Sequence, residues 1–505
     1  MSGEGTAGMT DEQSVQLKQA IGRLSLPNTS WRGILRHLGP GLILMMTGVG
    51  TSHLVTAPTA GGRFEFALLW CIPIAYIFKY YGFEMAFRFT NATGKSLIEA
   101  YGTAWKKWPL WYVMITTIIQ SAIGQAGRLA AAAAVAYYLF TTTFGWPLSQ
   151  LHYGFVLGAT AVAIILRGNY AAVETATKIL AGMLIASTFL VFFFRPVGAE
   201  AFSHFFIFET PAGSWLVIAA FLGLLPTGID VSLQASEWGK AKKVGMGRIR
   251  PELERAGLVE AFDPFSSSKM SLAVDTSKIP SHGVEYCRRW FQIGLWDFRL
   301  GHIVSFLLAC IFLLLSAVWM YPSEVAGNNV MGEIAKIFTE SIGPGMMVIF
   351  ILGAFAATYS TAFNYFDGWP RIVGACCRNM FRSTASLQGV AREDLTEAHR
   401  RHWYSEYNIY RLTMLFSFVS SVVIIAGIPR PVFLVLVASA LALFVAPVIY
   451  FLNLYYCLTI IPKTDTHFYP STFEVMFSWL SLAVFSGLTG IVILARVFGV
   501  ELFGA

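Results

Sequence analysis

The chain is dominated by apolar runs that are long enough to cross a lipid bilayer. A helix needs about 20 mostly apolar residues to span ~30 Å of hydrocarbon. Only 13% of the 505 residues are charged, roughly half the share found in soluble domains, so soluble, disordered and coiled-coil proteins are excluded. The runs are centred on residues 39–61, 66–88, 110–140, 151–167, 173–194, 214–236, 299–320, 343–369, 409–428, 431–458 and 474–496. The sequence therefore predicts an all-α polytopic membrane protein with eleven spans.

Basic residues are distributed unevenly among the segments that connect the spans. Lysines and arginines gather in the N-terminal tail, after the second span, and in segments 239–295 and 371–407, whereas the opposite segments hold few. Cytoplasmic segments of membrane proteins carry such an excess. We therefore expect a location in the cell membrane, with the N-terminus cytoplasmic and the C-terminus outside. The net charge of +7 is then a topology signal, and no nucleic-acid partner is expected.

Spans one and six are interrupted near their middle by residues that break helices. Residues 48–53 read Gly-Val-Gly-Thr-Ser-His, and residues 223–228 read Gly-Leu-Leu-Pro-Thr-Gly. Backbone groups freed by such breaks are tolerated in a membrane only where they line a cavity or the protein interior. The alternative is that the glycines only let helices pack closely. Two matched breaks five spans apart favour an inverted repeat of five plus five spans with an eleventh added, and hence alternating access.

This repeat gives the predicted division of the chain. Residues 1–36 form a cytoplasmic tail and residues 37–195 the first five-helix repeat. Residues 196–460 form the second repeat, with the cytoplasmic insertions at about 239–295 and 371–407. Residues 461–505 hold the eleventh helix and the C-terminus.

Several short motifs follow one another in a characteristic order along spans one to ten. They are Gly39-Pro-Gly, Ala60-Gly, Ala67-Leu-Leu-Trp, Thr93-Gly-Lys-Ser-Leu-Ile-Glu, Glu174, Pro226, Asp297 and Ser360-Thr361. In order and spacing this set resembles the natural resistance-associated macrophage protein (NRAMP) family of metal-ion transporters. The resemblance implies a LeuT-type fold and a secondary transporter.

The family's functional residues are replaced at the positions that align with them. In span one, the family's Asp-Pro-Gly-Asn motif aligns with Gly50-Thr51-Ser52-His53, so the metal-ligating aspartate is absent. In span six, the family's Ala-x-x-Met-Pro-His motif aligns with Leu222 to Thr227, which puts Leu225 in the place of the thioether ligand. In span three, the family's proton-transfer acids align with Gln125 and Arg128. The resemblance therefore implies a remodelled pathway.

These replacements make the pathway about four formal charges more positive than the family's. Removing water from a divalent cation is costly without carboxylate or soft ligands, so we expect no dehydrated metal site. Hydroxyls, one imidazole and two half-helix N-termini remain at the breaks, and helix N-termini favour anions. The predicted cargo is a small anion, such as an oxyanion like bicarbonate, or another polar non-metal solute.

The candidate substrate-binding residues lie at the two breaks, and the candidate pathway or coupling residues lie in span three. No catalytic constellation, cofactor site or metal site is recognised, so we do not expect an enzyme. The candidates are Gly50, Thr51, Ser52, His53, Leu222, Leu225, Thr227 and Asp230 for substrate binding, and Gln125 and Arg128 for the pathway or coupling.

Each charged candidate also has a structural interpretation. His53 is alternatively a satisfied structural group, and Asp230 a helix cap or ion-pair partner. Arg128 is alternatively paired with an acid such as Asp367. Lys79 and Glu84 in span two are expected near the cytoplasmic side, as gate or structural pairs.

Two other functions stay open at this point. A hydrated divalent cation, magnesium or a manganese-like ion, is one alternative cargo, because magnesium gives up its waters reluctantly. His53 and Asp230 would then be outer-sphere contacts. The other is a transport-inactive membrane sensor. The expected partners are the lipid bilayer and a small solute or ion, while oligomeric state and coupling ion stay open.

Overall fold

The computed structural model describes residues 11–37, 49–50, 52–168, 170–194, 196–266, 268–323, 332, 344–390 and 394–497. Regular secondary structure within these residues is helical, and they contain no strand. This confirms the predicted all-α fold class. Gly48 and Thr51, at the expected break of span one, lie outside the described residues.

The described helices follow the predicted spans in order along the chain. They are η1 (Ser52–Thr56) with α4 (Ala57–Phe64); α5 (Cys71–Thr93); α7 (Trp108–Ile119), η3 (Gln120–Gly124), α8 (Gln125–Ala136) and η4 (Tyr137–Thr143) in succession; α9 (Gln150–Arg167); α10 (Tyr170–Phe194); α11 (Trp215–Leu224) and α12 (Val231–Ala241); α14 (Ser281–Met320); α16 (Pro344–Met380); α19 (Glu406–Gly427); α20 (Pro431–Ile460); and α21 (Thr472–Val497). By length and composition alone, six of the described helices are able to cross a membrane.

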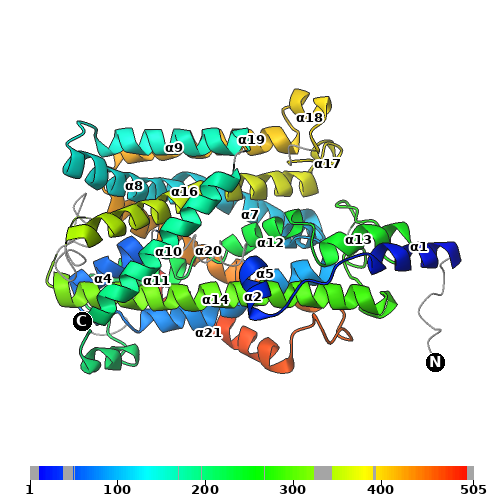
Figure 1. Ribbon diagram of the computed structural model, residues 1–505, viewed down its shortest axis with the longest axis horizontal. Helices are drawn as coiled ribbons and strands as arrows, with labels where there is room; N and C mark the ends of the chain where they lie inside the picture. Colours follow the sequence, from blue (N-terminus) through cyan, green and yellow to red (C-terminus); the bar gives the residue numbers. More distant parts are fainter. Residues whose placement is uncertain are drawn as a thin grey trace.

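Short helices occupy the connecting segments. They are α1 (Asp11–Gly22), α2 (Trp31–His37), α6 (Leu97–Tyr101), η2 (Trp105–Lys107), η5 (Ala199–Phe205), α13 (Met246–Arg255), η6 (Thr276–Lys278), α17 (Arg382–Ala385) and α18 (Glu397–Arg401). Of these, α1, α13, α17 and α18 lie towards one end of the molecule, which we call the α13 end (Figure 1).

The long helices run side by side along the molecule, and α10 crosses them obliquely (Figure 1). Helix α4 packs on α14, α10 on α16, and α11 on α20. Helix α12 contacts both α5 and α16. The two halves of span six are therefore enclosed by other spans, as a broken helix in a membrane requires.

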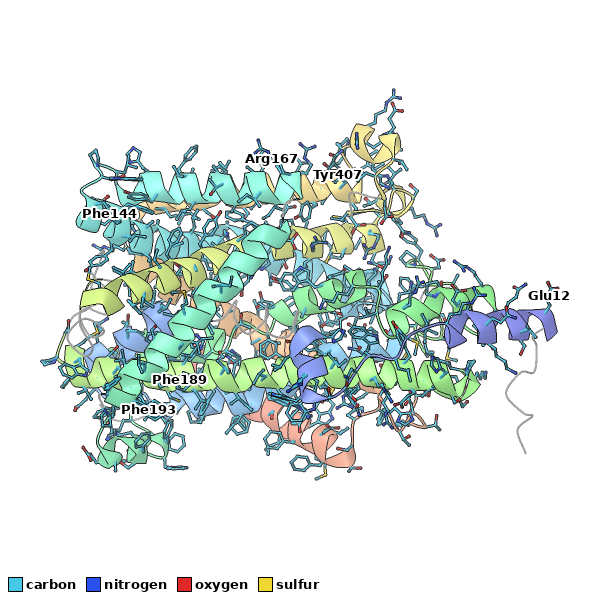
Figure 2. All side chains as sticks on the ribbon, in the orientation of Figure 1. Glu12, Phe144, Arg167, Phe189, Phe193 and Tyr407 are labelled. Atoms are coloured by element: carbon cyan, nitrogen blue, oxygen red, sulfur yellow. The ribbon has the colours of Figure 1, made fainter. Side chains whose placement is uncertain are left out.

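The outer surface of the bundle is apolar. Phe144 and Phe193 point outward and are 64% and 79% exposed (Figure 2). Many further large apolar side chains on α7, α19 and α21 are exposed in the same way. In a water-soluble protein such a surface would aggregate, whereas facing lipid it needs no partner.

Helix α14 begins at Ser281, well before the apolar run at 299–320 that predicted it. Residues 281–295, about the last quarter of the predicted insertion at 239–295, therefore belong to this helix. The apolar run marks only the part that faces lipid, and the helix continues beyond it as a polar extension. The rest of the segment is ordered around Arg250, which is 2% exposed and donates to the carbonyls of Thr93, Ser271 and Leu272.

Candidate functional site

The break in span six is held by a lysine from span two. Helix α11 ends at Leu224 and α12 begins at Val231, because Pro226 and Gly228 interrupt the helix between them. The ammonium nitrogen of Lys79 lies 2.9, 2.6 and 3.0 Å from the carbonyl oxygens of Gly223, Leu225 and Thr227. Lys79 is fully buried. Its expected role near the cytoplasmic side is therefore wrong: it lies in the middle of α5 and binds the broken helix.

The glycines at the breaks also bring helices close together. A Cβ atom on Gly223 would lie 2.0 Å from the carbonyl oxygen of Ser439 in α20. One on Gly50 would lie 2.0 Å from Oγ1 of Thr361 in α16. These glycines therefore allow close helix packing and also lie at the breaks, so the two interpretations apply together.

His53 joins span one to spans two and seven. Its Nε2 lies 2.9 Å from the hydroxyl of Tyr76 and 2.9 Å from the carbonyl oxygen of Ser305, and its Nδ1 lies 3.0 Å from Oγ of Ser52. The hydroxyls of Tyr76 and Ser305 are themselves 2.6 Å apart. Since a carbonyl only accepts, this geometry assigns the proton to Nε2, and in the neutral ring Nδ1 accepts from Ser52. We call Ser52, His53, Tyr76 and Ser305 the His53 network.

A second polar group surrounds Arg128 in span three. The guanidinium carbon lies 3.6 Å from the ring centre of Tyr365 and 4.9 Å from that of Trp369, both in α16. Nη1 of Arg128 donates to the carbonyl of Gly124 over 2.8 Å. The hydroxyl of Tyr365 lies 3.0 Å from Oγ1 of Thr227, so this group reaches the break of span six.

The alternative in which Arg128 pairs with Asp367 is wrong. Asp367 accepts instead from Nε of Arg371 over 2.7 Å, from the hydroxyl of Tyr410 over 2.6 Å and from Nε1 of Trp238 over 3.0 Å. Arg371 is one helical turn away on the same helix, so its side chain reaches the carboxylate without crossing the bundle.

Asp230 lies at the start of α12, beside Arg128. Its side chain makes no capping hydrogen bond to α12, so the cap interpretation is wrong. It turns back over Gly228, where an added Cβ would lie 2.2 Å from Oδ1. Arg128 and Lys79 both lie near enough to act electrostatically on this carboxylate. Residues 221–229 are buried, whereas Asp230 keeps some accessible surface.

Several buried polar atoms near the break of span six have no hydrogen-bond partner among the described residues. They are Oε1 of Gln120 and both amide atoms of Gln234, whose side chain lies against Gly368 beside Trp369. A Cβ on Gly124 would touch Gln120, Arg128 and Trp369 at 2.5 to 2.9 Å, which places these three side chains together. Buried polar groups normally have partners, so water or a polar solute is needed here. We call Gln120, Arg128, Asp230, Gln234 and Trp369 the central cluster.

The remaining candidates have other surroundings. Gln125 donates from Nε2 to the carbonyl of Ala362 over 2.8 Å and so ties α8 to α16. Leu222 lines a separate apolar cavity of about 310 Å³, together with Trp70, Trp215 and Ile491. Leu225 contributes its carbonyl to Lys79.

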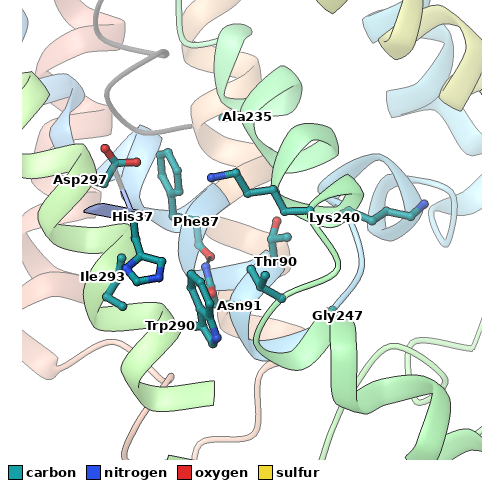
Figure 3. A pocket seen from close by; sticks show the side chains of 15 residues that line it. His37, Phe87, Thr90, Asn91, Ala235, Lys240, Gly247, Trp290, Ile293 and Asp297 are labelled. Carbon is teal, nitrogen blue, oxygen red and sulfur yellow. Dashed lines mark hydrogen bonds between the residues drawn. The ribbon is translucent and has the colours of Figure 1, made fainter. Parts of the chain in front are cut away.

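A small pocket of about 60 Å³ opens towards the α13 end of the bundle (Figure 3). It is lined by the ends of α5, α12 and α14 and by His37 of α2. Figure 3 shows His37, Trp290 and Asp297 on one side and Lys240 on the other. Because α12 follows directly on Asp230 and carries Lys240, this polar pocket lies further along the helix that begins at the central cluster.

The structure thus groups the predicted residues into two sets. Thr227, Asp230 and Arg128 come together at the central cluster, and Ser52 and His53 belong to the His53 network. Sequence reasoning missed Tyr76 and Ser305 of the His53 network, and it missed Gln234 and Trp369 of the central cluster together with Tyr365 beside Arg128. Such residues in apolar helices look like ordinary packing. Lys79 carried a signal, since a lysine in the middle of a span requires a partner.

Comparisons with known proteins agree with this architecture. A family model described as natural resistance-associated macrophage protein-like matches residues 41–495. An uncharacterized protein of Pasteurella multocida is 21% identical over 357 residues, which cover 68% of this chain and 71% of that protein. The divalent metal cation transporter MntH of Bacillus subtilis is 27% identical over 307 residues, which cover 56% of this chain and 66% of MntH.

Solved structures show the same fold at low sequence identity. A crystal structure of a mutant manganese transporter of Eremococcus coleocola superposes with a TM-score of 0.61 at 12% identity, over 95% of this chain and 92% of that one. Mhp1, a nucleobase-cation-symport-1 family transporter, superposes with a TM-score of 0.52 at 12% identity, over 92% of this chain and 94% of Mhp1. The chain therefore belongs to the Nramp family and is a multi-pass membrane transporter with the LeuT-type fold.

Proposed function

We propose that this transporter moves a small anion, such as an oxyanion like bicarbonate, or another polar non-metal solute, and that the solute binds at the central cluster. The observation that carries the proposal is the guanidinium of Arg128. It is 4% exposed, donates from Nη1 to the carbonyl of Gly124, and lies against the ring and hydroxyl of Tyr365. A guanidinium has five N–H donors in a planar fork, which suits the two oxygens of an oxyanion.

The charges around the break support the same cargo. Lys79 and Arg128 are cationic and Asp230 is anionic, so the formal sum is one positive charge. The N-terminus of α12 adds a partial positive charge. A monovalent anion would neutralise this sum, whereas a divalent cation would add to it. The unpartnered amide of Gln234 can donate a hydrogen bond to a polar solute, and Oε1 of Gln120 can accept one from it.

The proposed movement is alternating access around the break at residues 225–230. The non-helical linker lets α11 and α12 change their relative direction, and the His53 network links span one to spans two and seven. The proposal involves no catalytic step, resident cofactor or dehydrated metal site. Ser52, His53 and Thr227 remain proposed solute contacts.

Divalent metal transport is the second candidate. It is favoured by the relatives, since the Bacillus subtilis protein is named a divalent metal cation transporter and the Eremococcus coleocola protein a manganese transporter. Asp230 and His53 would then contact a hydrated ion through its waters.

Flux measurements on the purified protein in proteoliposomes separate the two candidates. We expect saturable uptake of labelled bicarbonate and no saturable uptake of manganese or magnesium. Arg128→Gln should abolish anion uptake, while Arg255→Gln, a matched loss of one arginine in the exposed pair with Glu252, should retain it. Saturable metal uptake without anion uptake would refute the anion proposal. If neither bicarbonate nor a divalent metal is taken up, transport of both kinds of solute is refuted.

We further propose that the α13 end faces the cytoplasm, with the C-terminus outside and residues 37–195 and 196–460 as the two repeats. The six cysteines lie in described residues and are all buried. Arg255→Cys should therefore introduce the dominant reactive thiol. An impermeant maleimide should label it in inside-out vesicles and not in intact cells, and labelling of intact cells would reverse the orientation.

A further inference from the structure

The carbonyl groups at the break of span six form a site for a positive charge. The last carbonyls of a helix lack intrahelical partners and carry the negative end of the helix dipole. Gly223 in the last turn of α11, together with Leu225 and Thr227 in the linker that follows, points its carbonyl at one position in the bundle. In transporters with broken helices, unwound carbonyls and half-helix C-terminal ends coordinate cations. Here that position is filled by the ammonium of Lys79.

The number of contacts fits a lysine that carries its proton in this conformation. An ammonium group has three N–H donors and no acceptor. The three carbonyl oxygens at 2.6 to 3.0 Å use all three donors. A neutral amine would have two donors and would turn its lone pair towards the third oxygen, which is repulsive.

Other groups around the ammonium do not replace the carbonyls. The ring of Phe485 in α21 lies 5.6 Å from Nζ and adds a weak cation–π contact. Asp230 acts on Lys79 only through space, since no ion pair within 4.0 Å joins them in the described residues. His302 lies near as well. The charge is thus stabilised mainly by backbone oxygens, as a free metal or ammonium ion would be.

We propose that Lys79 is a built-in monovalent cation: its ammonium fills a carbonyl site that binds a free compact monovalent cation, such as ammonium or potassium, when the lysine side chain is removed. The site adjoins the central cluster through Asp230, and the proposal holds whichever solute the transporter carries. Lys79 acts there as a positioning residue, because it fixes the end of α11 to α5.

The test is chemical rescue of the full-length protein in detergent. Lys79→Ala leaves the carbonyls and space for an ion, whereas Lys79→Met fills the space without a charge. Lys107→Ala is the matched control, because Lys107 also donates to two carbonyls, those of Pro264 and Asn379, but in a half-exposed connecting segment where water replaces it. Melting temperatures are compared in ammonium, ethylammonium, potassium and choline chloride at one ionic strength, with choline as the cation that is too large to enter.

We expect the melting temperature of Lys79→Ala to fall in choline and to rise saturably with ammonium, ethylammonium or potassium. The wild type, Lys79→Met and Lys107→Ala should show no such cation-specific rise. If Lys79→Ala is obtained only when ammonium or potassium is present throughout purification, the proposal is also supported. It is overturned if Lys79→Ala responds to no cation, responds only as Lys107→Ala does, or cannot be obtained even in ammonium.

Discussion

The close contact between α11 and α20 at Gly223 makes a quantitative prediction. A Cβ at this position would lie 2.0 Å from the carbonyl oxygen of Ser439 and 2.9 Å from the amide nitrogen of Leu443. Comfortable carbon–oxygen contacts are about 3.3 to 3.6 Å. Both neighbours are backbone atoms, so Gly223→Ala must move the two helices apart by more than about 1 Å.

The cost of that movement has two parts. Inserting a methyl group into a packed helix interface costs about 1–3 kcal/mol, and sometimes more. The same shift pulls the Gly223 carbonyl away from the Lys79 ammonium, now at 2.9 Å, and a hydrogen bond to a charged group is worth about 1.5–3 kcal/mol. Alanine's better helix propensity returns at most about 1 kcal/mol. We expect a net loss of about 2–5 kcal/mol.

Thermal unfolding of the detergent-purified protein measures this loss. Gly182→Ala is the control, because Gly182 lies in α10 and nothing stands within 4 Å of an added Cβ. That variant should melt with the wild type or slightly above it, while Gly223→Ala should melt well below. Equal melting temperatures for Gly223→Ala and the wild type would show that α11 and α20 are not in the described contact.

Two further predictions concern single side-chain contacts. Thr227→Val and Tyr365→Phe each remove one partner of the 3.0 Å contact between their hydroxyls and should each cost about 1 kcal/mol; a double mutant that costs the full sum would show that the two do not interact. Burial alone would raise the pKa of Glu99, which lies in α6 outside the spans, but Lys240, Arg378 and Lys95 outweigh burial and hold the pKa at about 2, below its ordinary 4.5. The contribution of ionised Glu99 to the free energy of unfolding is therefore present above pH 4.5 and lost as the pH falls towards 2. The difference in free energy of unfolding between the wild type and Glu99→Gln should narrow over that range. A difference that stays constant would contradict the ion-pair account.

The sequence was most informative about elements whose cause is local. Long apolar runs predicted the spans, because crossing a bilayer requires them. The Pro226 break followed from the missing N–H and ring of proline. The ion pair between Asp367 and Arg371 could also be predicted, since residues four apart share a helix face. The alternative considered from the sequence paired Asp367 with Arg128 instead.

Contacts between distant spans could not be predicted from the sequence in the same way. Depth along a span does not tell which helix a side chain meets, so Lys79 was placed at the membrane edge although it binds the broken span six. Tyr365 and Trp369 resemble lipid-facing or core aromatics until the rings are seen beside Arg128. Helix register and packing partner decided these cases, and a single sequence contains neither.

The covalent attachment of the Lys79 ammonium to α5 has a thermodynamic consequence. A free ion bound at such carbonyls does work by leaving them and moving down its concentration gradient. A charge on a side chain cannot leave, so it supplies binding energy at this place and no driving force. Any uphill movement of solute must therefore draw on another source, such as the membrane voltage or a second ion that binds elsewhere in the pathway.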